Sequence, residues 1–142
     1  MSRIKVQLPP NSIAQFNIPV RITDINYGNH VGNNAIVEII HEARVQFLNN
    51  YGFTELNVAG TALIMNELLV EFKNESFYKD LLQVKIFIGE ISNKSFEIFY
   101  LITVEKNGTD KIIAKAKTGM VCYNYAEKKI ETLPAKLKEI LL

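Results

Sequence analysis

Residues 24–34 read DINYGNHVGNN, and residues 35–50 continue as AIVEIIHEARVQFLNN. The first stretch holds one aspartate, four asparagines, two glycines and one histidine, which is a composition typical of turns and helix starts. The second stretch places apolar residues at helical spacing around most of its circumference. It therefore predicts a buried helix over 35–50, with Asn34 as N-cap and Gly52 as the stop. A polar loop that enters a buried helix needs an explanation, because a helix start presents unpaired N–H groups.

The length and composition fit a single globular domain spanning residues 1–142. The chain is 48% hydrophobic and 22% charged, and 142 residues are enough to bury a core. Its net charge is +1, with basic residues spread along the chain, so we expect no nucleic-acid partner. Residues 1–10 lack a leader-like apolar segment, and all apolar runs are short. We therefore expect a cytoplasmic protein with no membrane partner.

The cysteine and histidine content argues against metal chemistry. Cys122 is the single cysteine, which excludes an intramolecular disulfide and a multi-cysteine metal site. It lies in the apolar run 120–123, so we expect a thiol packed within a strand. His41 and Glu42 lack the His-Glu-x-x-His spacing of a helical zinc site, and His30 does not complete one. The sequence thus predicts no metal and no cofactor.

The rest of the chain predicts mainly strands. Residues 16–23 (FNIPVRIT) form the first, and Pro19 favours an edge strand or a bulge there. Beyond the helix we expect strands at 62–73, 82–92, 96–106 and 112–125, with hairpin turns at 92–95 and 106–109 and a short helix at 134–142. This order predicts an α+β fold in which a curved antiparallel β-sheet wraps a long buried central helix. Because such a sheet has open edges, we expect a dimer that continues it.

With these elements in place, the chain resembles the hotdog-fold acyl-CoA thioesterases of the 4-hydroxybenzoyl-CoA thioesterase-like family. That family typically carries Asp-x-Asp-x-x-Gly-His-Val-Asn-Asn in the loop and Glu-x-Ala-Arg in the helix. Residues 24–33 align with the loop motif without a gap, and the alignment continues to Glu42, Ala43 and Arg44. The resemblance covers nearly the whole chain. It implies a hotdog fold, hydrolysis of an acyl-CoA thioester, and a homodimer or homotetramer, with coenzyme A entering as part of the substrate.

Several positions depart from the family pattern. Asn26 stands where the family has its usual catalytic aspartate, and Asn29 stands where it has glycine, although Gly28 is adjacent. His41 replaces the first glutamate of the helix motif, and Glu42 follows it. The first departure bears on the chemistry, because an asparagine cannot act as a base or a carboxylate nucleophile.

Thioester hydrolysis requires donors for the developing oxyanion and a group that activates water or attacks the carbonyl. The N-terminus of a helix supplies such donors through its unpaired N–H groups and its dipole. The resemblance implies this role for the backbone N–H of Asn33. Asn26 and His30 are then expected to position the thioester and the water.

The base is not identified by the family motif here. Helical spacing places Glu38 and Glu42 on one polar stripe of the helix, so both are candidates, and Asp24 is the third. An alternative reading makes the stripe a solvated or subunit-interface surface, with Arg44 and Gln46 nearby.

The loop residues also have structural alternatives. Asn26, Asn33 and Asn34 suit turn and cap positions because of their local hydrogen bonding. His30 can tie the loop to the backbone, and Asp24 can brace it by accepting N–H bonds. Both the catalytic and the structural reading are open for each residue.

Two other functions are compatible with the fold. A non-catalytic protein that binds acyl thioesters, as a sensor or carrier partner, is supported by Asn26 at the aspartate position. Hydratase or dehydratase chemistry resembles other hotdog families, but their usual Asp/His or Glu/His loop pattern is absent from this sequence. The acyl group, and the choice between coenzyme A and acyl carrier protein, are not readable from the residues.

Overall fold

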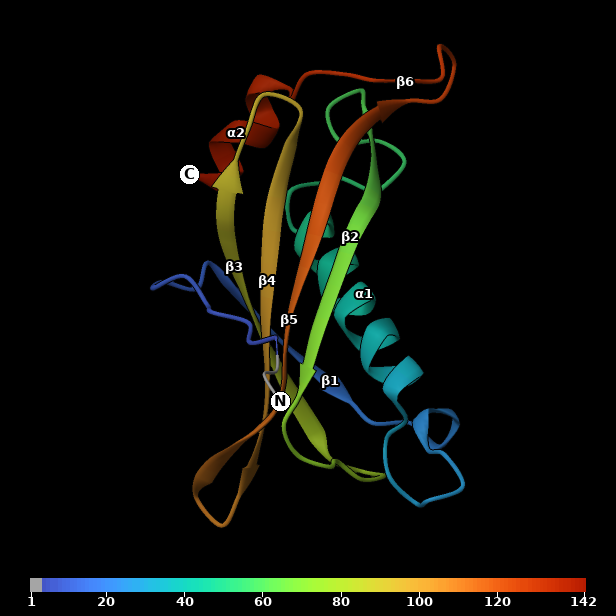
Figure 1. Cartoon of the computed structure of the whole chain (residues 1–142), viewed down its shortest axis with the longest axis vertical. Helices are drawn as coiled ribbons and strands as arrows, with labels where there is room; N and C mark the ends of the chain where they lie inside the picture. The colour runs from blue at the N-terminus through green and yellow to red at the C-terminus, as the bar shows by residue number, and fades with distance from the viewer. Residues whose placement is uncertain (1–3) are drawn as a thin grey trace.

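The computed structural model describes residues 4–142, so residues 1–3 of the predicted domain and N-terminal segment lie outside the described part (Figure 1). The elements run in the order β1 (Ala14–Pro19), η1 (Ile22–Asp24), α1 (Asn33–Asn49), β2 (Ala62–Phe72), β3 (Leu81–Ile91), β4 (Ser95–Lys106), β5 (Thr109–Asn124), β6 (Lys129–Ile130) and α2 (Ala135–Leu141).

One six-stranded antiparallel sheet forms the body of the protein. Its order is β1-β3-β4-β5-β2, with the short β6 paired to β5. Register shifts in β2, β3 and the β4–β5 pair act as bulges, which bend and twist a sheet. Figure 1 shows α1 lying beside the sheet, with the loop before it at the same end as the β2–β3 connection. The predicted α+β class with a curved antiparallel sheet is confirmed.

The core lies between α1 and the inward-facing side chains of the sheet. Through much of β3 and β4 buried residues alternate with more exposed ones, as strand geometry requires, whereas residues 118–122 of β5 are all buried. The buried core of the helix consists of Ala35, Ile36, Ile39, Ile40, Ala43, Phe47 and Leu48. Burial of these side chains is the main contribution that holds α1 against the sheet.

The opposite side of α1 is exposed. A polar stripe of Asn34, Glu38, His41 and Glu42 faces solvent, and Val37, Val45 and Gln46 are half-buried. Burial around most of the circumference, as the sequence predicts, therefore does not hold within a single chain. The reason is that only one sheet packs on the helix here, so the side turned away from it has no neighbour.

The start of α1 lies earlier than predicted. Gly32, not Asn34, is the N-cap, with an extended backbone (φ −74°, ψ 159°), and its carbonyl accepts the Ile36 amide. The Gly32 amide is bound in turn to the carbonyl of Asp24 at 3.1 Å. This contact with the preceding turn directs the chain into the helix two residues early, so Asn33 and Asn34 occupy the first turn.

The end of α1 matches the prediction for Gly52. Gly52 has φ +75°, its amide donates to Asn49 O, and the Phe53 amide donates to Leu48 O. This is the Schellman pattern, in which a residue in the left-handed region closes the helix.

Gly52→Ala is expected to lower the free energy of unfolding by about 1 kcal/mol, because a Cβ disfavours the left-handed backbone. No described atom lies within 4 Å of the added Cβ, so the cost comes from the backbone alone. Urea denaturation measures it. Asn50→Ala is the matched control, since Asn50 has helical angles (φ −59°, ψ −22°) and no loss is expected. Equal stability of Gly52→Ala and wild type would contradict this account.

Smaller differences concern the strand boundaries. The first strand ends at Pro19 rather than continuing to residue 23, and a 3-10 turn over Ile22–Asp24 replaces its predicted end. As expected for Pro19, β1 is an edge strand, paired with β3 alone among the described strands. The hairpin turn at 106–109 is confirmed, with positive φ at Asn107 and Gly108. The two-residue β6 was not predicted, because so short a strand has no periodicity to read.

Cys122 is a buried thiol in β5, as predicted. Burial, reinforced by the charge of Glu131, raises its pKa to about 11. A thiol with so high a pKa carries almost no thiolate at neutral pH, which makes it unreactive.

Candidate active site

The loop between η1 and α1 is tightly bound to itself and to a neighbouring connection. An isolated bridge joins Ile25 to Val31, and the Asn26 amide donates to His30 O at 2.9 Å. The Val31 amide donates to the carbonyl of Ser76, in the β2–β3 connection, at 2.8 Å. The loop therefore forms a short hairpin whose two sides are hydrogen-bonded to each other, and the Val31 amide attaches it to the β2–β3 connection of the sheet.

Asn26 has its side chain at the centre of this loop. Its Oδ1 accepts the amide of Gly28 at 2.9 Å, as in an Asx turn, and that of His30 at 3.5 Å. Because Oδ1 is used in this way, Nδ2 is the free donor, and it lies 3.8 Å from the position that a Cβ on Gly32 would take. Asn26 therefore fills the structural turn role and also presents a donor beside the start of α1.

Asn29 explains one departure from the family motif. Its φ is +65°, in the left-handed region that glycine adopts most easily and asparagine tolerates better than most residues. A family glycine at this position and an asparagine here thus satisfy the same backbone requirement.

His30 is half-buried and fixed by a local contact. Its Nδ1 lies 3.1 Å from Val31 O, which can only accept, so Nδ1 carries the proton. In the neutral ring, Nε2 is then an acceptor, and it lies 3.4 Å from the position of a Cβ on Gly28. The structure thus shows the backbone contact of the structural reading and leaves Nε2 available for a water or a substrate.

The first turn of α1 lacks a side-chain cap. Gly32 cannot cap through a side chain, and no residue of the described range 4–142 forms a side-chain cap hydrogen bond at this terminus. Among the described residues, the amides of Asn33, Asn34 and Ala35 have no acceptor. These are the donors that a helix normally satisfies with a side chain, water or ligand.

Five of the six candidate residues from the sequence meet at one pocket beside this terminus, here called the helix-start pocket. Its lining includes Asp24, Asn26, His30, Asn33 and Glu38. Glu42 is not part of it. The polar loop and the first two turns of α1 thus surround one pocket. Around it lie the unpaired backbone amides of the helix start, the side-chain amides of Asn26 and Asn33, the imidazole of His30, and the carboxylates of Asp24 and Glu38.

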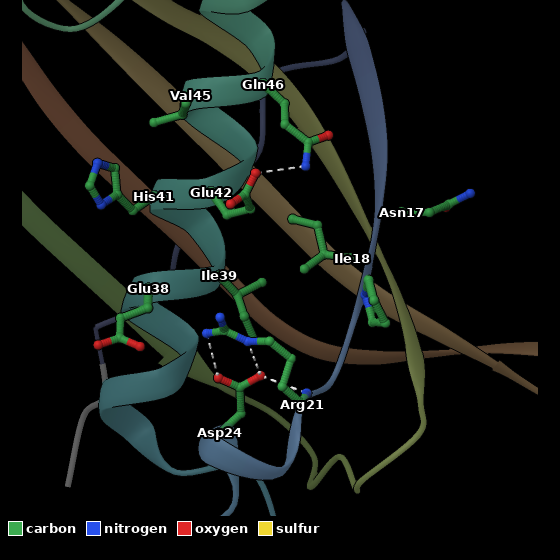
Figure 2. Close-up of a pocket in the computed structure, with 11 residues that line it drawn as sticks. Asn17, Ile18, Arg21, Asp24, Glu38, Ile39, His41, Glu42, Val45 and Gln46 are labelled. Atoms are coloured by element: carbon green, nitrogen blue, oxygen red, sulfur yellow. Dashed lines mark hydrogen bonds and ion pairs between the residues drawn. The ribbon is translucent and has the colours of Figure 1, made fainter.

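Asp24 is buried and fully engaged. It accepts the Arg21 amide at 2.8 Å and the Arg21 Nη2 at 3.2 Å, and this carboxylate raises the pKa of Arg21 (Figure 2). Its backbone carbonyl accepts the Gly32 amide. Asp24 thus sits where bracing of the loop was expected, between the 3-10 turn and the start of α1.

Glu38 and Glu42 differ in their surroundings. Both are exposed on α1 and line a groove of about 440 Å³ between α1 and β1 (Figure 2). The Glu42 carboxylate accepts a hydrogen bond from Gln46 Nε2 at 2.8 Å. The Glu38 carboxylate has no hydrogen bond or ion pair within residues 4–142, and it alone of the two also borders the helix-start pocket.

Arg44, the arginine of the helix motif, holds α1 to the sheet. It is buried, and its Nε donates to Glu55 Oε2 at 3.2 Å while Nη1 donates to Tyr100 Oη at 3.1 Å. Tyr100 in turn lies 2.8 Å from Thr118 Oγ1, and burial raises its pKa, which keeps the hydroxyl neutral. His41 Nε2 contacts the second Glu55 oxygen at 2.6 Å. Arg44 is thus a structural residue at some distance along α1 from the pocket.

Two residues at or near the site were missed by the sequence reasoning. Arg21 could have been noted, because oppositely charged residues three positions apart can pair on a helical turn. Ser76 gives no sequence signal, since it reaches the loop only through the fold. Within residues 4–142, no group of three potential metal ligands occurs, and no helix has the length and apolar character needed to cross a bilayer.

Comparison with known proteins identifies the family. The long-chain acyl-CoA thioesterase FadM of Escherichia coli (strain K12) is 26% identical over 128 residues, covering 89% of this chain and 96% of that protein. The 1,4-dihydroxy-2-naphthoyl-CoA hydrolase of Acaryochloris marina (strain MBIC 11017) is 28% identical over 121 residues, covering 83% and 88%.

A crystal structure supports the same fold assignment. Slr0204, a 1,4-dihydroxy-2-naphthoyl-CoA thioesterase from Synechocystis, superposes with a TM-score of 0.80 at 22% identity, covering 89% of this chain and 93% of that one. The family model of the thioesterase-like superfamily matches residues 20–141. The predicted resemblance is therefore confirmed, and the chain belongs to the thioesterase-like superfamily of hotdog proteins.

Proposed function

We propose that the protein is an enzyme that hydrolyses an acyl-CoA thioester to the free acid and coenzyme A. Its superfamily and the names of its curated relatives support this activity. The single observation that carries it is the uncapped start of α1, which opens onto a pocket shared with Asn26, His30 and Glu38.

In this proposal the thioester carbonyl lies at the start of α1. The amides of Asn33 and Asn34 donate to the carbonyl oxygen as it gains negative charge, and the helix dipole adds to the stabilisation. The Nδ2 group of Asn26 is a further donor on the same side. Gly28 and Gly32 leave space for the approach of the substrate.

Glu38 is our choice for the base. It lies four residues, about 6 Å of helical rise, beyond Asn34, which suits activation of a water more than direct attack. The Glu38 carboxylate accepts a proton from the water while the water oxygen attacks the carbonyl carbon. When the tetrahedral intermediate collapses, the C–S bond breaks and the same proton passes to the leaving thiolate. His30 Nε2 holds the water in place by accepting a hydrogen bond from the other O–H of the water.

Asp24 is assigned a bracing role, because Arg21 occupies its carboxylate. Glu42 is assigned to the stripe outside the pocket, since it does not border the helix start. Asn26 is compatible with catalysis in this scheme because the base is supplied from the helix.

We also propose that the active unit is a homodimer or a dimer of dimers in the cytoplasm, with α1 as its central buried helix. The free edge of β2 supports this, since Met65, Leu68 and Phe72 are exposed along it. An exposed edge strand with apolar side chains is a ready surface for pairing with a second copy. The polar stripe of α1 would then face a partner subunit rather than solvent.

A non-catalytic binding protein is the less favoured reading. Its support was Asn26, and Glu38 removes the need for a carboxylate at that position. The curated relatives are named as a thioesterase and a hydrolase, which also favours turnover.

The experiment that tests the proposal is free-thiol release by the purified protein. The substrate panel runs from acetyl-CoA to palmitoyl-CoA and includes benzoyl-CoA and phenylacetyl-CoA. We expect release well above the rate without enzyme for at least one member. A flat panel with a folded protein that still binds acyl-CoA would overturn hydrolysis and establish the binding reading.

A further inference from the structure

Two carboxylates lie at the boundary between the helix-start pocket and the groove that separates α1 from β1. Among the described residues, the linings of these two hollows share only Asp24 and Glu38. Figure 2 shows both side chains at one end of the groove, with Arg21 beside them. Asp24 comes from η1 and Glu38 from α1, so the fold brings two like charges together from separate elements.

Like charges at such a boundary repel each other unless a cation neutralises one of them. Arg21 is the only lysine or arginine that lines either hollow within residues 4–142. Its guanidinium binds Asp24 at two points, with Nη2 donating to Oδ1 at 3.2 Å and Nε donating to Oδ2 at 3.5 Å. The side chain of Asp24 is 2% exposed, whereas that of Arg21 is 66% exposed. A neutral pair, instead of a bare carboxylate, therefore lies next to Glu38.

Three other titratable groups face the hollows that Glu38 borders. Glu42, further along α1, accepts a hydrogen bond from a glutamine of the same helix. His41, also on α1, contacts the carboxylate of Glu55. His30 borders the helix-start pocket from the loop, and its Nδ1 contacts a backbone carbonyl. Within residues 4–142 none of the three pairs with the aspartate, so its neutralisation depends on the arginine.

The interaction between Arg21 and the carboxylates around it is mutual. The pKa of Arg21 is raised, chiefly by its hydrogen bond to Asp24 and the charge of that carboxylate, and to a smaller extent by the charges of Glu38 and Glu42. An interaction energy belongs to both groups, so a carboxylate that stabilises the guanidinium is itself stabilised in its charged form. Arg21 therefore favours ionised Glu38 both by its own charge and by neutralising that of Asp24.

We propose that Arg21 is a positioning residue for the reaction: through its pair with Asp24 it keeps Glu38 ionised, and so able to act as a base, at neutral pH. This inference rests on the proposed hydrolase function, in which Glu38 takes the proton of the water. The pair also accounts for a base that lies beside a second, buried carboxylate and still carries its charge.

The first test is the pH dependence of kcat/KM on the acyl-CoA with the highest turnover. A base must be ionised, so activity falls on the acid side of the profile. In Arg21→Met the acid limb is expected to move up by about 0.5–1 pH unit, because the unpaired Asp24 then opposes ionisation of Glu38. In Asp24→Asn the unmatched charge of Arg21 is expected to move the limb down. The double variant lacks both charges and should return the limb close to that of wild type.

Two further variants separate charge from structure. Arg21→Lys keeps the charge but loses the two-point contact, so the acid limb is expected to stay near that of wild type even where kcat falls. Lys129→Met removes a positive charge from an exposed pair in β6, at the opposite end of the molecule from the loop (Figure 1), and should leave the limb in place. Loss of activity in Arg21→Met and Asp24→Asn without opposite movements of the limb would overturn the proposal, because a loosened loop predicts no such difference in sign.

Carbon-13 NMR of the carboxyl groups follows Glu38 directly and does not require turnover. This matters because His30 must also be neutral in the proposed mechanism, so the rate profile alone does not identify which group titrates. The resonance of Glu38 is the one missing from the spectrum of Glu38→Gln. Its titration midpoint is expected to move up in Arg21→Met and down in Asp24→Asn. Equal midpoints in wild type and both variants contradict the proposal.

The two methods distinguish failure of this inference from failure of the proposed function. Opposite NMR shifts in a protein that hydrolyses no acyl-CoA leave the charge relation between Arg21 and Glu38 standing and show that hydrolysis is wrong. Hydrolysis with an unmoved Glu38 titration leaves the function intact and overturns the role of Arg21.

Discussion

Glu38→Gln is expected to lower kcat on the best acyl-CoA by about 100-fold or more, the usual contribution of a positioned base. The change removes the carboxylate that borders the helix-start pocket while keeping its size and its helical position. KM should change little, because the amides of α1 and the other residues of the helix-start pocket still bind the substrate. Steady-state kinetics of thiol release measures both quantities, and circular dichroism confirms that the variant is folded.

Glu42→Gln is the matched control, one turn further along the same helix. Glu42 bonds to Gln46 and does not reach the helix-start pocket, so kcat should stay within about threefold of wild type. The reverse pattern, with the large loss in Glu42→Gln, would assign the base to Glu42. Loss in neither variant would remove the helix carboxylates from the mechanism. Asn26→Asp in the Glu38→Gln background then asks whether the loop can supply the carboxylate instead.

Arg44→Met is expected to lower the free energy of unfolding by about 2–4 kcal/mol. This is less than the cost of breaking a fully buried ion pair, because the side chain of Glu55 is partly exposed. The variant keeps most of the apolar volume of the side chain but leaves the Glu55 carboxylate with His41 alone. It also removes the donor to Tyr100, which is completely buried. The link from α1 to β4 and β5 is lost with it.

Urea denaturation at one fixed protein concentration measures this effect, since a dimer makes stability depend on concentration. Lys129→Met is the control, because the Lys129–Glu127 pair is exposed on both sides and contributes at most about 1 kcal/mol. If the two variants unfold at the same urea concentration, the Arg44 network is not a significant source of stability.

Local sequence signals predicted the elements of the fold well. The periodicity of 35–50 gave α1 to within two residues at each end, and Gly52 and the Asn107-Gly108 turn were identified by their backbone requirements. These features depend on residues close together in the chain, so their signals are complete in the sequence. The start of α1 was misplaced because a contact between Gly32 and Asp24, not an asparagine cap, determines it.

The candidate site was predicted only in part. The sequence by itself determined that a polar loop leads directly into a helix, because both lie within one short segment. Only the tertiary structure decided that Glu38 borders the pocket and Glu42 does not, that the side chain of Arg21 pairs with Asp24, and that the Ser76 carbonyl accepts the Val31 amide. The last contact joins positions 45 residues apart, and the choice between two glutamates on one helix depends on which neighbours the fold places around each. Such pairings depend on packing between distant segments, which periodicity and spacing along the chain do not encode.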